Sequence, residues 1–439
     1  MTDYYVRPSG GSYGNEDGSD YANAWDGFTN INWATVDAGD GKLFVAGTHY
    51  ETMTVGASGE AGVPIQIVSC TIANGATNDD PATIDGSATR YYGIQINSQT
   101  YITIDGITIQ NCLGRVPGIG NNACIEVTGS NCTVKNCTLY CNTSRGIDVE
   151  YAQNFTLQNT LIDSTATDTA NENDLLFFWG GGGGSPGHII GGEAGKGNHF
   201  YQRTIGSSLY IDGIQTYNED GPMEVSYNYF QDESPGGGNN MLIQIERGSG
   251  QYNIYNNIIM RNNPNDNQAP VICDTDGTMV FEHNTVVNLI GFGINQLSGT
   301  LQARNNIFYA GTRECYSSTN APPAGWPNNN LYYHLEGPTH SIGADPASHN
   351  WAQWAEQYET AGDYGDPLFT NLAGRDFTLQ GGSPAIGLGD ARANLNIGPS
   401  DDYLGNPRDA TTPDVGAHEY QLAGVVMPIA MAYYRQRRN

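Results

Sequence analysis

One short apolar segment returns along most of this chain, and it restricts the chain to a repeat fold. Copies such as GIQIN from Gly93 and GIDVE from Gly146 alternate apolar and polar residues, as a strand with one buried face does. The second residues of two neighbouring copies, Ile125 and Ile147, are 22 residues apart, and insertions lengthen other intervals. The full column reads Ile94, Ile125, Ile147, Leu176, Ile214, Ile243, Ile272 and Ile294. Such a period is typical of a solenoid in which each repeat forms one coil.

A second recurring segment follows the first, for example YITIDGITI from Tyr101 and YNIYNNII from Tyr252. Aligning these segments gives one column of Asn136, Asn159, Asn228, Asn257, Asn284 and Asn306, with Gly106 in the first coil. A buried Asn at each bend can hydrogen-bond the coils above and below it and satisfy turn amides. We therefore predict that the column is structural. The coil with HIIGGEAGKGN, from His188, lacks an Asn at the expected place.

The two segments together predict an all-β fold, a right-handed single-stranded parallel β-helix with an N-terminal cap and irregular C-terminal closing coils. We expect one continuous domain, with the cap and first coils in residues 1–70, the β-helix body in 71–334 and the closing coils and tail in 335–439. The ends of such a stack need a cover. Short helices are expected near Trp25–Val36 and over NWAQWAEQYE from Asn350.

The composition agrees with short strands joined by frequent turns. The chain has 57 Gly in 439 residues, is 38% hydrophobic and 15% charged, and contains 27 Tyr. Gly accepts turn conformations at low cost, and the aromatic content is too high for a disordered chain. The formal net charge of −28 repels nucleic acid and anionic membranes, so we expect neither as a partner.

The chain ends and the cysteines add few constraints. The start, MTDYYVRPSG, shows no signal peptide, and VVMPIAMAYY near the end is too short to span a bilayer. We expect an extracellular or virion-associated protein, monomeric or, if derived from a virion, trimeric. The eight Cys include no CxxC pair, and the cluster over Cys112–Cys141 has no nearby His. Buried thiols are therefore favoured over a zinc site, and the spacing does not decide whether two of these cysteines form a disulfide.

The two ends also carry motifs of a known kind. The opening YYVRPSGG, AWDGF and GDGKLFVAGTHY resembles the beginning of many pectate-lyase-like right-handed parallel β-helix proteins. The segment GDPLFTNLAGRDFTLQGGSPAIGLGD and the later PDVGAHEY are similar to the closing coils of those proteins. Together with the repeat, the resemblance covers nearly the whole chain. It implies the fold and a polysaccharide partner, but the superfamily includes lyases, hydrolases, epimerases, phage tail proteins and adhesins, so it does not select a chemistry.

Two columns of residues in the first segment are predicted to face outward. The first column reads Gln95, Glu126, Asp148, Phe177, Gln215, Gln244, Cys273 and Asn295. The second reads Asn97, Thr128, Glu150, Trp179, Tyr217, Glu246, Thr275 and Leu297. Adjacent coils lie about 4.8 Å apart. Glu126 and Asp148 should therefore be roughly 5 Å apart, which is the spacing of a retaining glycosidase pair.

This acidic and aromatic face suggests a sugar-binding groove. Neighbouring carboxylates raise one pKa and can leave an acid beside a base, and exposed aromatic rings beside carboxylates commonly hold sugars. The candidate catalytic residues are Asp148, Asp212, Glu126, Glu150 and Glu246. The candidate substrate-binding residues are Trp179, Tyr217, Gln215, Gln244, Arg145, Arg247 and His199. The alternative is a solvated polar face, which strand alternation alone predicts.

Insertions are placed so that they would form a wall beside these columns. Five inserted segments each precede a copy of the first segment: LGRVPGIGNNA, DSTATDTANEND, HFYQRTIGSSLYID, QDESPGGGNN and RNNPNDNQAP. Loops on a rigid scaffold often carry function. Arg145, Asp174 and Asp212 lie at this edge. Asp212 could act as an acid or base, although an Asp before Gly more often caps a turn. The run Gly180–Gly184 would leave room for a ligand.

Three functions remain open. Hydrolysis of glycosidic bonds by paired carboxylates is slightly preferred, because acidic residues are abundant and only three lysines exist, Lys42, Lys135 and Lys196. The first alternative is β-elimination on a uronate polymer by Arg145, Arg247, Tyr217 or His199, assisted by Ca²⁺. Acidic tracts that could bind Ca²⁺ are Asn171–Asp174, Asp232–Glu233 and Asp274–Asp276. The second alternative is a non-catalytic phage tail or adhesin-type glycan-binding protein.

Overall fold

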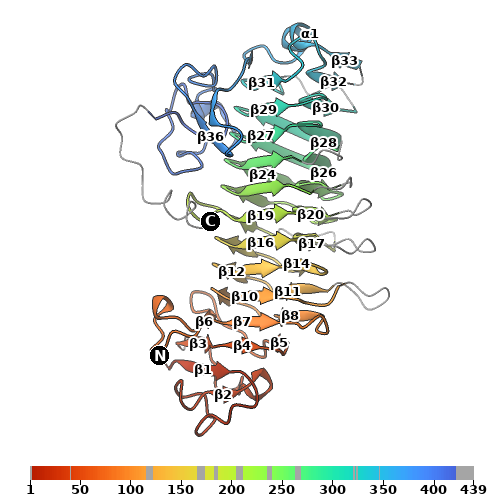
Figure 1. The fold of residues 1–439 in the computed structure, drawn as a ribbon. Coiled ribbons are helices and arrows are strands. Elements are labelled where there is room, and N and C mark those ends of the chain that lie inside the picture. The colour runs from red at the N-terminus through yellow and green to blue at the C-terminus, as the bar shows by residue number, and fades with distance from the viewer. Residues whose placement is uncertain are drawn as a thin grey trace. The chain divides into compact units, whose positions relative to one another are not determined.

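The structure of the chain is a computed structural model in which short parallel strands stack in successive coils (Figure 1). It describes residues 2–39, 41–114, 122–165, 174–181, 186–203, 211–234, 240–262, 268–319, 322, 325–345 and 347–421. The five predicted wall insertions lie partly outside the described residues, as do residues 182–184 of the glycine run. The wall itself therefore stays a prediction.

Many coils contain three strands, where the sequence patterns predicted two. In one coil these are β8 (Tyr92–Gln95), β9 (Ile102–Asp105) and β10 (Thr108–Gln110). The second recurring segment was interpreted as one bent strand, but Gly106 has a φ of 75° and separates β9 from β10. Because one left-handed residue turns the backbone sharply, the segment yields a second and a third strand with different faces.

The chain divides into two compact units, which we describe separately. Unit 1 comprises residues 1–189, 198–219 and 234–238, and unit 2 comprises residues 190–197, 220–233 and 239–439. The predicted division of one continuous domain into cap, body and closing coils remains a prediction.

Unit 1 contains three parallel rows of strands. The first row is β5 (Met53–Thr54), β8, β11 (Ala123–Val127), β14 (Arg145–Glu150), β17 (Leu176–Trp179) and β20 (Ile214–Tyr217). The second row is β1 (Tyr4–Arg7), β3 (Lys42–Val45), β6 (Ile65–Ser69), β9, β12 (Thr133–Lys135), β15 (Thr156–Gln158) and β18 (His188–Ile190), whose last residue belongs to unit 2. The third row is β4 (Thr48–His49), β7 (Thr83–Asp85), β10, β13 (Thr138–Tyr140), β16 (Leu161–Ser164) and β19 (His199–Gln202).

The register of the first row follows the apolar column of the sequence. Ile94, Ile125, Ile147, Leu176 and Ile214 are successive cross-strand partners, and all are fully buried. Each such side chain stabilises the fold by about 1.5–3 kcal/mol through burial. A slip of one residue would turn the column to solvent, so the apolar pattern fixes the register.

The N-terminal part of unit 1 is built around aromatic contacts. It contains β2 (Trp25–Asp26) and the short 3-10 helices η1 (Phe28–Asn30) and η2 (Ile72–Asn74). The helix expected near Trp25–Val36 is thus reduced to the single turn of η1. The ring of Phe28 stacks on His49 at 3.9 Å, and burial lowers the pKa of His49 to about 4. His49 is therefore a neutral core residue at pH 7.

Unit 2 also contains three parallel rows of strands, numbered here in the same way. The first row is β23 (Ile243–Glu246), the beginnings of β26 (Val271–Glu282) and β28 (Ile294–Arg304), then β30 (Tyr316–Ser318) and β32 (Gly343–Asp345). The second row is β21 (Met223–Ser226), β24 (Gln251–Tyr255) and the ends of β26 and β28. The third row is β22 (Tyr229–Asp232), β25 (Ile258–Arg261), β27 (Thr285–Asn288), β29 (Ile307–Ala310), β31 (Leu331–His334) and β34 (Asp363–Tyr364).

One copy of the repeat in unit 2 was misaligned by one residue. Val271, and not Ile272, is the partner of Ile243 and of Ile294. The outward positions of this strand are therefore Ile272 and Asp274, where Cys273 and Thr275 were predicted. Cys273 and Thr275 are fully buried. Because VICDT has two adjacent apolar residues at its start, alternation alone could not choose between the two registers.

A ladder of buried asparagines runs through unit 2 at the bend between the second and third rows. Each backbone N–H donates to the Oδ1 of the Asn in the next coil, at 2.8–3.0 Å, and each side-chain amide donates to a carbonyl in the preceding coil. The members are Asn228, Asn257, Asn284, Asn306 and Asn330, all fully buried. Glu359 ends the ladder, because its Oε1 accepts from the N–H of Asn330 at 3.0 Å. The predicted structural role of Asn228, Asn257, Asn284 and Asn306 is confirmed.

Asn136 and Asn159 do not belong to this column, which corrects the alignment. They occupy the preceding left-handed position, with φ of 55° and 46°, and the next residues, Cys137 and Thr160, point inward. The amide of Asn159 instead donates to Oδ1 of Asn136 at 2.5 Å on the outside of unit 1. In the coil that lacked an Asn at the expected place, Asn198 takes the ladder role, and residues 191–197 separate it from β18. It accepts from the N–H of Thr160 at 3.0 Å and donates to the carbonyl of Leu157 at 2.9 Å.

The C-terminal part of unit 2 includes β33 (Ala347–His349), which pairs antiparallel with β32, and the helix α1 (Trp351–Gln357). The helix expected from Asn350 is confirmed, since Asn350 forms a capping box with Gln353. β35 (Phe369–Asn371), β36 (Asp376–Leu379) and η3 (Arg392–Asn394) follow. None of the helices in the described part of the chain is long and apolar enough to cross a membrane.

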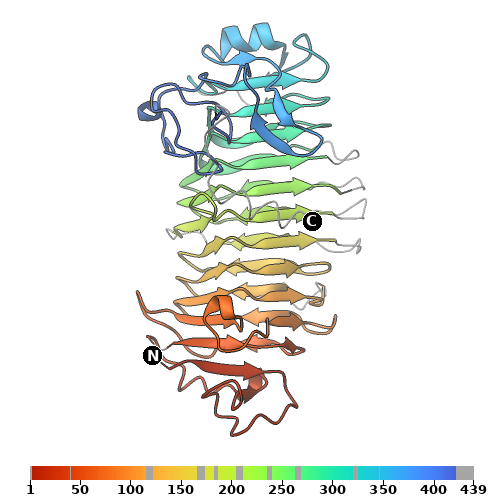
Figure 2. The ribbon, with the colours of Figure 1, turned by 60° about the vertical axis from the view of Figure 1, so that its left-hand side comes forward.

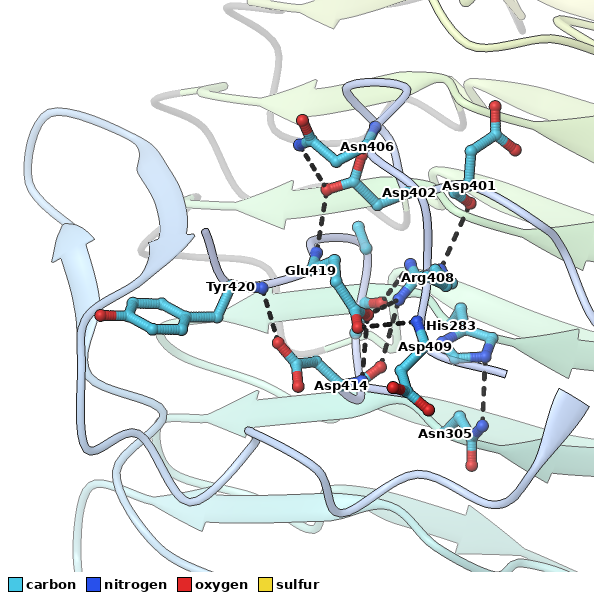
Figure 3. Close-up of polar contacts among 12 residues, drawn as sticks. His283, Asn305, Asp401, Asp402, Asn406, Arg408, Asp409, Asp414, Glu419 and Tyr420 are labelled. Atoms are coloured by element: carbon cyan, nitrogen blue, oxygen red, sulfur yellow. Dashed lines mark hydrogen bonds and ion pairs between the residues drawn. The ribbon is translucent and has the colours of Figure 1, made fainter. Parts of the chain in front are cut away.

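Residues 365–421 lie along the outside of the third row of unit 2 (Figure 2). Phe369, Phe377 and Val415 join an apolar cluster with Tyr309 and Leu331 of β29 and β31. Arg408 binds this segment to the bend between the second and third rows and is fully buried (Figure 3). Its guanidinium donates to Oδ1 of Asn256 at 2.8 Å and forms an ion pair with Glu419 at 3.3 Å.

Candidate active site

The outward columns of unit 1 agree with the sequence prediction. Glu126 is the register partner of Gln95 on one side and of Asp148 on the other, and Asp148 is the partner of Phe177. In the second column, Glu150, Trp179 and Tyr217 are successive partners on β14, β17 and β20. These strands stack in order in the first row (Figure 1). The columns divide by burial into two groups.

The first group is buried, and we call Arg145, Asp148, Asp174 and Asp212 the arginine cluster. Nη1 of Arg145 lies 3.2 Å from Oδ2 of Asp148, and Nε lies 3.6 Å from Oδ2 of Asp174. The guanidinium stacks on the ring of Phe177, 3.6 Å from its centroid. The backbone N–H of Asp212 donates to Oδ1 of Asp174 at 3.1 Å. All four side chains are almost completely buried.

Burial raises the pKa of Asp148 to about 7, although the neighbouring Arg145 acts in the opposite direction. The negative charges of Glu150 and Glu126 raise the pKa further. Oδ1 of Asp148 has no hydrogen-bond partner among the described residues. Asp148 can therefore change its protonation state near neutral pH, and with it the charge that Arg145 and the two glutamates experience.

The second group is partly exposed, and we call Glu126, Glu150, Trp179 and Tyr217 the outer strip. The rings of Trp179 and Tyr217 stack with centroids 5.0 Å apart and planes 30° apart, and Trp179 is 36% exposed. Nε2 of Gln95 donates to Oε2 of Glu126 at 2.9 Å and fixes the orientation of that carboxylate. The aromatic surface of Trp179 and Tyr217 thus lies on the same face as the carboxylates of Glu126 and Glu150.

No family model and no curated protein matches the sequence. Two solved structures match the fold along nearly the whole length of both chains. One is pectate lyase Pel9A, with 17% identity, a TM-score of 0.50, and 95% of this chain and 96% of that chain covered. The other is XylC in complex with xylose, with 10% identity, a TM-score of 0.55, and 95% and 98% covered.

The chain has the pectate-lyase-like right-handed parallel β-helix fold. The expectation drawn from the two end motifs and from the repeat is therefore confirmed at the level of fold. At these identities the comparison carries nothing about the reaction.

Within this fold, His199 lies on another face than predicted. It belongs to β19 of the third row, where it stacks on Tyr201 at 5.4 Å. The third-row strand pairs with β16, while Trp179 and Tyr217 belong to the first row. The structure therefore does not bring His199 to the outer strip. The prediction assigned residues 199–212 to an insertion beside the groove, whereas residues 199–202 form β19.

Three further candidates belong to unit 2. Oε2 of Glu246 accepts from Gln244 at 3.2 Å, and Oε1 lies 3.3 Å from Nε of Arg247. The side chain of Arg247 is largely exposed. These residues form a small polar group on β23 and are described with unit 2 alone. Gln215 lies on β20 in unit 1, as the register partner of Phe177.

In the described part of the chain, the acidic tracts do not gather as a calcium site. Asp232 pairs with Arg261 at 3.2 Å, Glu233 pairs with Arg375, and Asp274 accepts from Ser298 at 2.8 Å. Asn171 to Asn173 lie outside the described residues. Across the described ranges, no three His, Cys, Asp or Glu side chains gather as metal ligands would. In the arginine cluster, the guanidinium of Arg145 already occupies the position of a cation between two carboxylates, so we derive no step through Ca²⁺.

Two residues of this face were missed in the sequence. Tyr92 is the register partner of Ala123, which in turn pairs with Arg145. Burial, the charge of Glu126 and a hydrogen bond to Glu126 all raise the pKa of the Tyr92 hydroxyl. Tyr151 follows Glu150 directly, and its side chain is 64% exposed. A Cβ on Gly181 would lie only 3.1 Å from its ring. Tyr92 could have been found because, like Arg145, it stands two residues before the inward Ile of its strand, and Tyr151 because it follows Glu150 directly.

Proposed function

We propose that unit 1 binds a polysaccharide along the outer strip and hydrolyses its glycosidic bonds. The observation that carries this proposal is the register of Glu150, Trp179 and Tyr217, which puts a carboxylate in line with a stacked aromatic pair. A sugar ring that lies on Trp179 would present its hydroxyl groups and its linkage to the neighbouring carboxylate. Aromatic faces suit the apolar side of a sugar, and carboxylates suit its hydroxyl groups.

Glu126 and Glu150 are the carboxylate pair of the proposal. They lie on adjacent strands and two residues out of register, because Glu126 pairs with Asp148. With about 4.8 Å between strands and about 3.3 Å per residue, this diagonal is about 8 Å at the backbone. Carboxylates about 6.5–9.5 Å apart leave room for a water and invert the anomeric centre. One glutamate would protonate the leaving oxygen, and the other would activate that water.

Asp148 takes a different role from the one predicted for it in the sequence. Its side chain is 1% exposed and paired with Arg145, so it is proposed as a positioning residue. Its carboxyl group lies beside Glu126 and Glu150, whose charges raise its pKa, and its protonation changes the charge next to both glutamates. Asp212 is likewise assigned to the arginine cluster, where it supports Asp174.

The test is a polysaccharide panel with two readouts, the release of reducing ends and the absorbance of unsaturated products. Reducing ends without unsaturated products are expected, with inverted configuration at the new anomeric centre by proton NMR. Glu126→Gln and Glu150→Gln should each lower kcat by about 100-fold or more. Glu356→Gln, an exposed residue of α1, should leave kcat unchanged.

Other outcomes separate the alternatives. Unsaturated products would identify a polysaccharide lyase and refute hydrolysis. Binding to a polysaccharide without cleavage of any would favour a glycan-binding protein of the phage tail or adhesin type. Wild-type kcat in both glutamine variants would remove the outer strip as the active site.

A further inference from the structure

We infer that the polysaccharide is neutral, built from sugars without carboxylate groups. This inference rests on the proposed function and names the substrate class for the same strip. The described charges around the outer strip and the contacts of Arg145 support it.

The carboxylates of this face form a compact anionic group. Asp148 is the partner of Glu126 across the strands and lies two residues from Glu150 on the same face of β14. Their mutual influence is visible at Asp148, where the charges of both glutamates raise the pKa. A uronate carboxylate brought to this place would add another negative charge to an already repulsive group.

Arg145 is not available to neutralise such a substrate. Its guanidinium is held by Asp148 at 3.2 Å, by Asp174 at 3.6 Å, and by the Phe177 ring at 3.6 Å. Only 7% of the side chain is exposed. Turning outward would leave two buried carboxylates without a cation, which is strongly unfavourable. The positive charge of Arg145 is thus neutralised by carboxylates of the protein itself.

The remaining described cations of unit 1 contact other parts of that unit, and the exposed Arg90, just before β8, donates from Nε to the carbonyl of Tyr50 at 3.3 Å. Lys135 pairs with Asp105 at 3.2 Å on the second row, and Arg203 is paired with Asp163 on the third row. Arg7 lies between the rings of Tyr13 and Tyr21, and Lys42 donates to a carbonyl near η2. Among the described residues, the outer strip therefore offers a substrate aromatic rings, amides and carboxylates, which suit neutral hydroxylated sugars.

This inference also bears on the reaction. β-Elimination requires a carboxylate at the sugar C5 to acidify the neighbouring C–H bond, and that carboxylate needs a cation beside it. A neutral sugar lacks it, so only hydrolysis is open: water adds across the bond between the anomeric carbon and the bridging oxygen, and the leaving oxygen takes a proton. The balance needs no further reactant.

The experiment compares pairs of polymers that share sugar and linkage configuration and differ only at C6, such as β-1,4-glucan and its C6-oxidised form, and β-1,4-mannan and β-1,4-polymannuronate. The full-length protein is assayed for reducing ends at low and at high salt. The neutral member of the cleaved pair should react at least tenfold faster at low salt, because a like charge at about 4 Å costs one factor of ten or more. The preference should shrink as salt screens the repulsion.

A binding assay tests whether the charge of Glu150 causes this preference. Glu150→Gln, read by affinity electrophoresis, should narrow the preference for the neutral member, and Glu356→Gln should keep the wild-type preference. Faster cleavage of a uronate member, or unsaturated ends from it, would overturn the substrate class while leaving polysaccharide cleavage in place. No cleavage and no binding of any pair would overturn the proposed function and this inference with it.

Discussion

At the scale of single residues, the account depends on Trp179 as a binding surface. Trp179→Ala removes the larger ring of the Trp179–Tyr217 stack, while the backbone pairing of β17 remains. Loss of one aromatic contact of about 1.4 kcal/mol corresponds to a tenfold weaker Kd. Titration of the protein with an oligosaccharide that it binds would measure the Kd. The control is Tyr50→Ala, because Tyr50 is 59% exposed on another part of unit 1. An unchanged Kd for Trp179→Ala would place the sugar elsewhere.

Arg145 is the residue whose loss should cost unit 1 the most stability. Arg145→Met keeps the apolar stem but leaves Asp148 and Asp174 buried without their cation. Removal of one partner from a buried ion pair costs about 3–5 kcal/mol. Denaturant unfolding should report this loss, and Arg90→Met, at an exposed site, should change the free energy of unfolding by less than about 0.5 kcal/mol. Equal effects of the two changes would contradict the role assigned to Arg145.

At the scale of structural elements, the asparagine ladder is the feature that joins neighbouring coils of unit 2. Asn284→Ala would leave the N–H of Asn257 and the carbonyl of Ile254 without partners inside the core. Each unsatisfied buried group costs about 1–3 kcal/mol. Asn253→Ala on the neighbouring coil removes a side-chain contact with Gln251 and should cost little. Thermal unfolding would compare them, and a similar shift in Tm for both would argue against the ladder.

The elements also show what a sequence can and cannot predict. The columns through Glu126, Glu150 and Trp179 were predictable, because alternation and a repeat together fix the direction of each side chain. The burial of Asp148 was not, because alternation gives direction but not what covers a residue. Asn136 and Asn228 look alike in sequence, yet one takes a left-handed position and the other the inward position after it. Only the backbone conformation separates them.

At the scale of the whole molecule, stability should fall as the pH rises above neutrality. Burial raises the pKa of Asp148, Glu359 and Glu419 to about 7 in the folded state. A carboxyl group with a raised folded pKa contributes stability that is present below its unfolded pKa and is lost as the pH rises through the folded value. Buried histidines such as His49, with a pKa of about 4, act in the opposite sense below pH 6.5.

Between pH 6.5 and 8.5 the carboxyl groups therefore decide how stability changes with pH. Tm should be lower at pH 8.5 than at pH 6.5. Glu359→Gln removes the ionisable group while an amide oxygen can still accept from Asn330, so this variant should show a smaller decrease in Tm. Differential scanning calorimetry at the two pH values would measure both proteins. A Tm that rises with pH in this window would show that these three carboxyl groups are not buried in the protonated form.

The most direct test of the central claim is a crystal structure of the full chain carrying Glu150→Gln, with a neutral oligosaccharide bound. The account predicts one sugar ring on Trp179, with the linkage to be cleaved between Glu126 and the new amide at position 150, and Arg145 still paired with Asp148. An oligosaccharide bound away from β11, β14 and β17, or one whose linkage contacts neither Glu126 nor position 150, would contradict it.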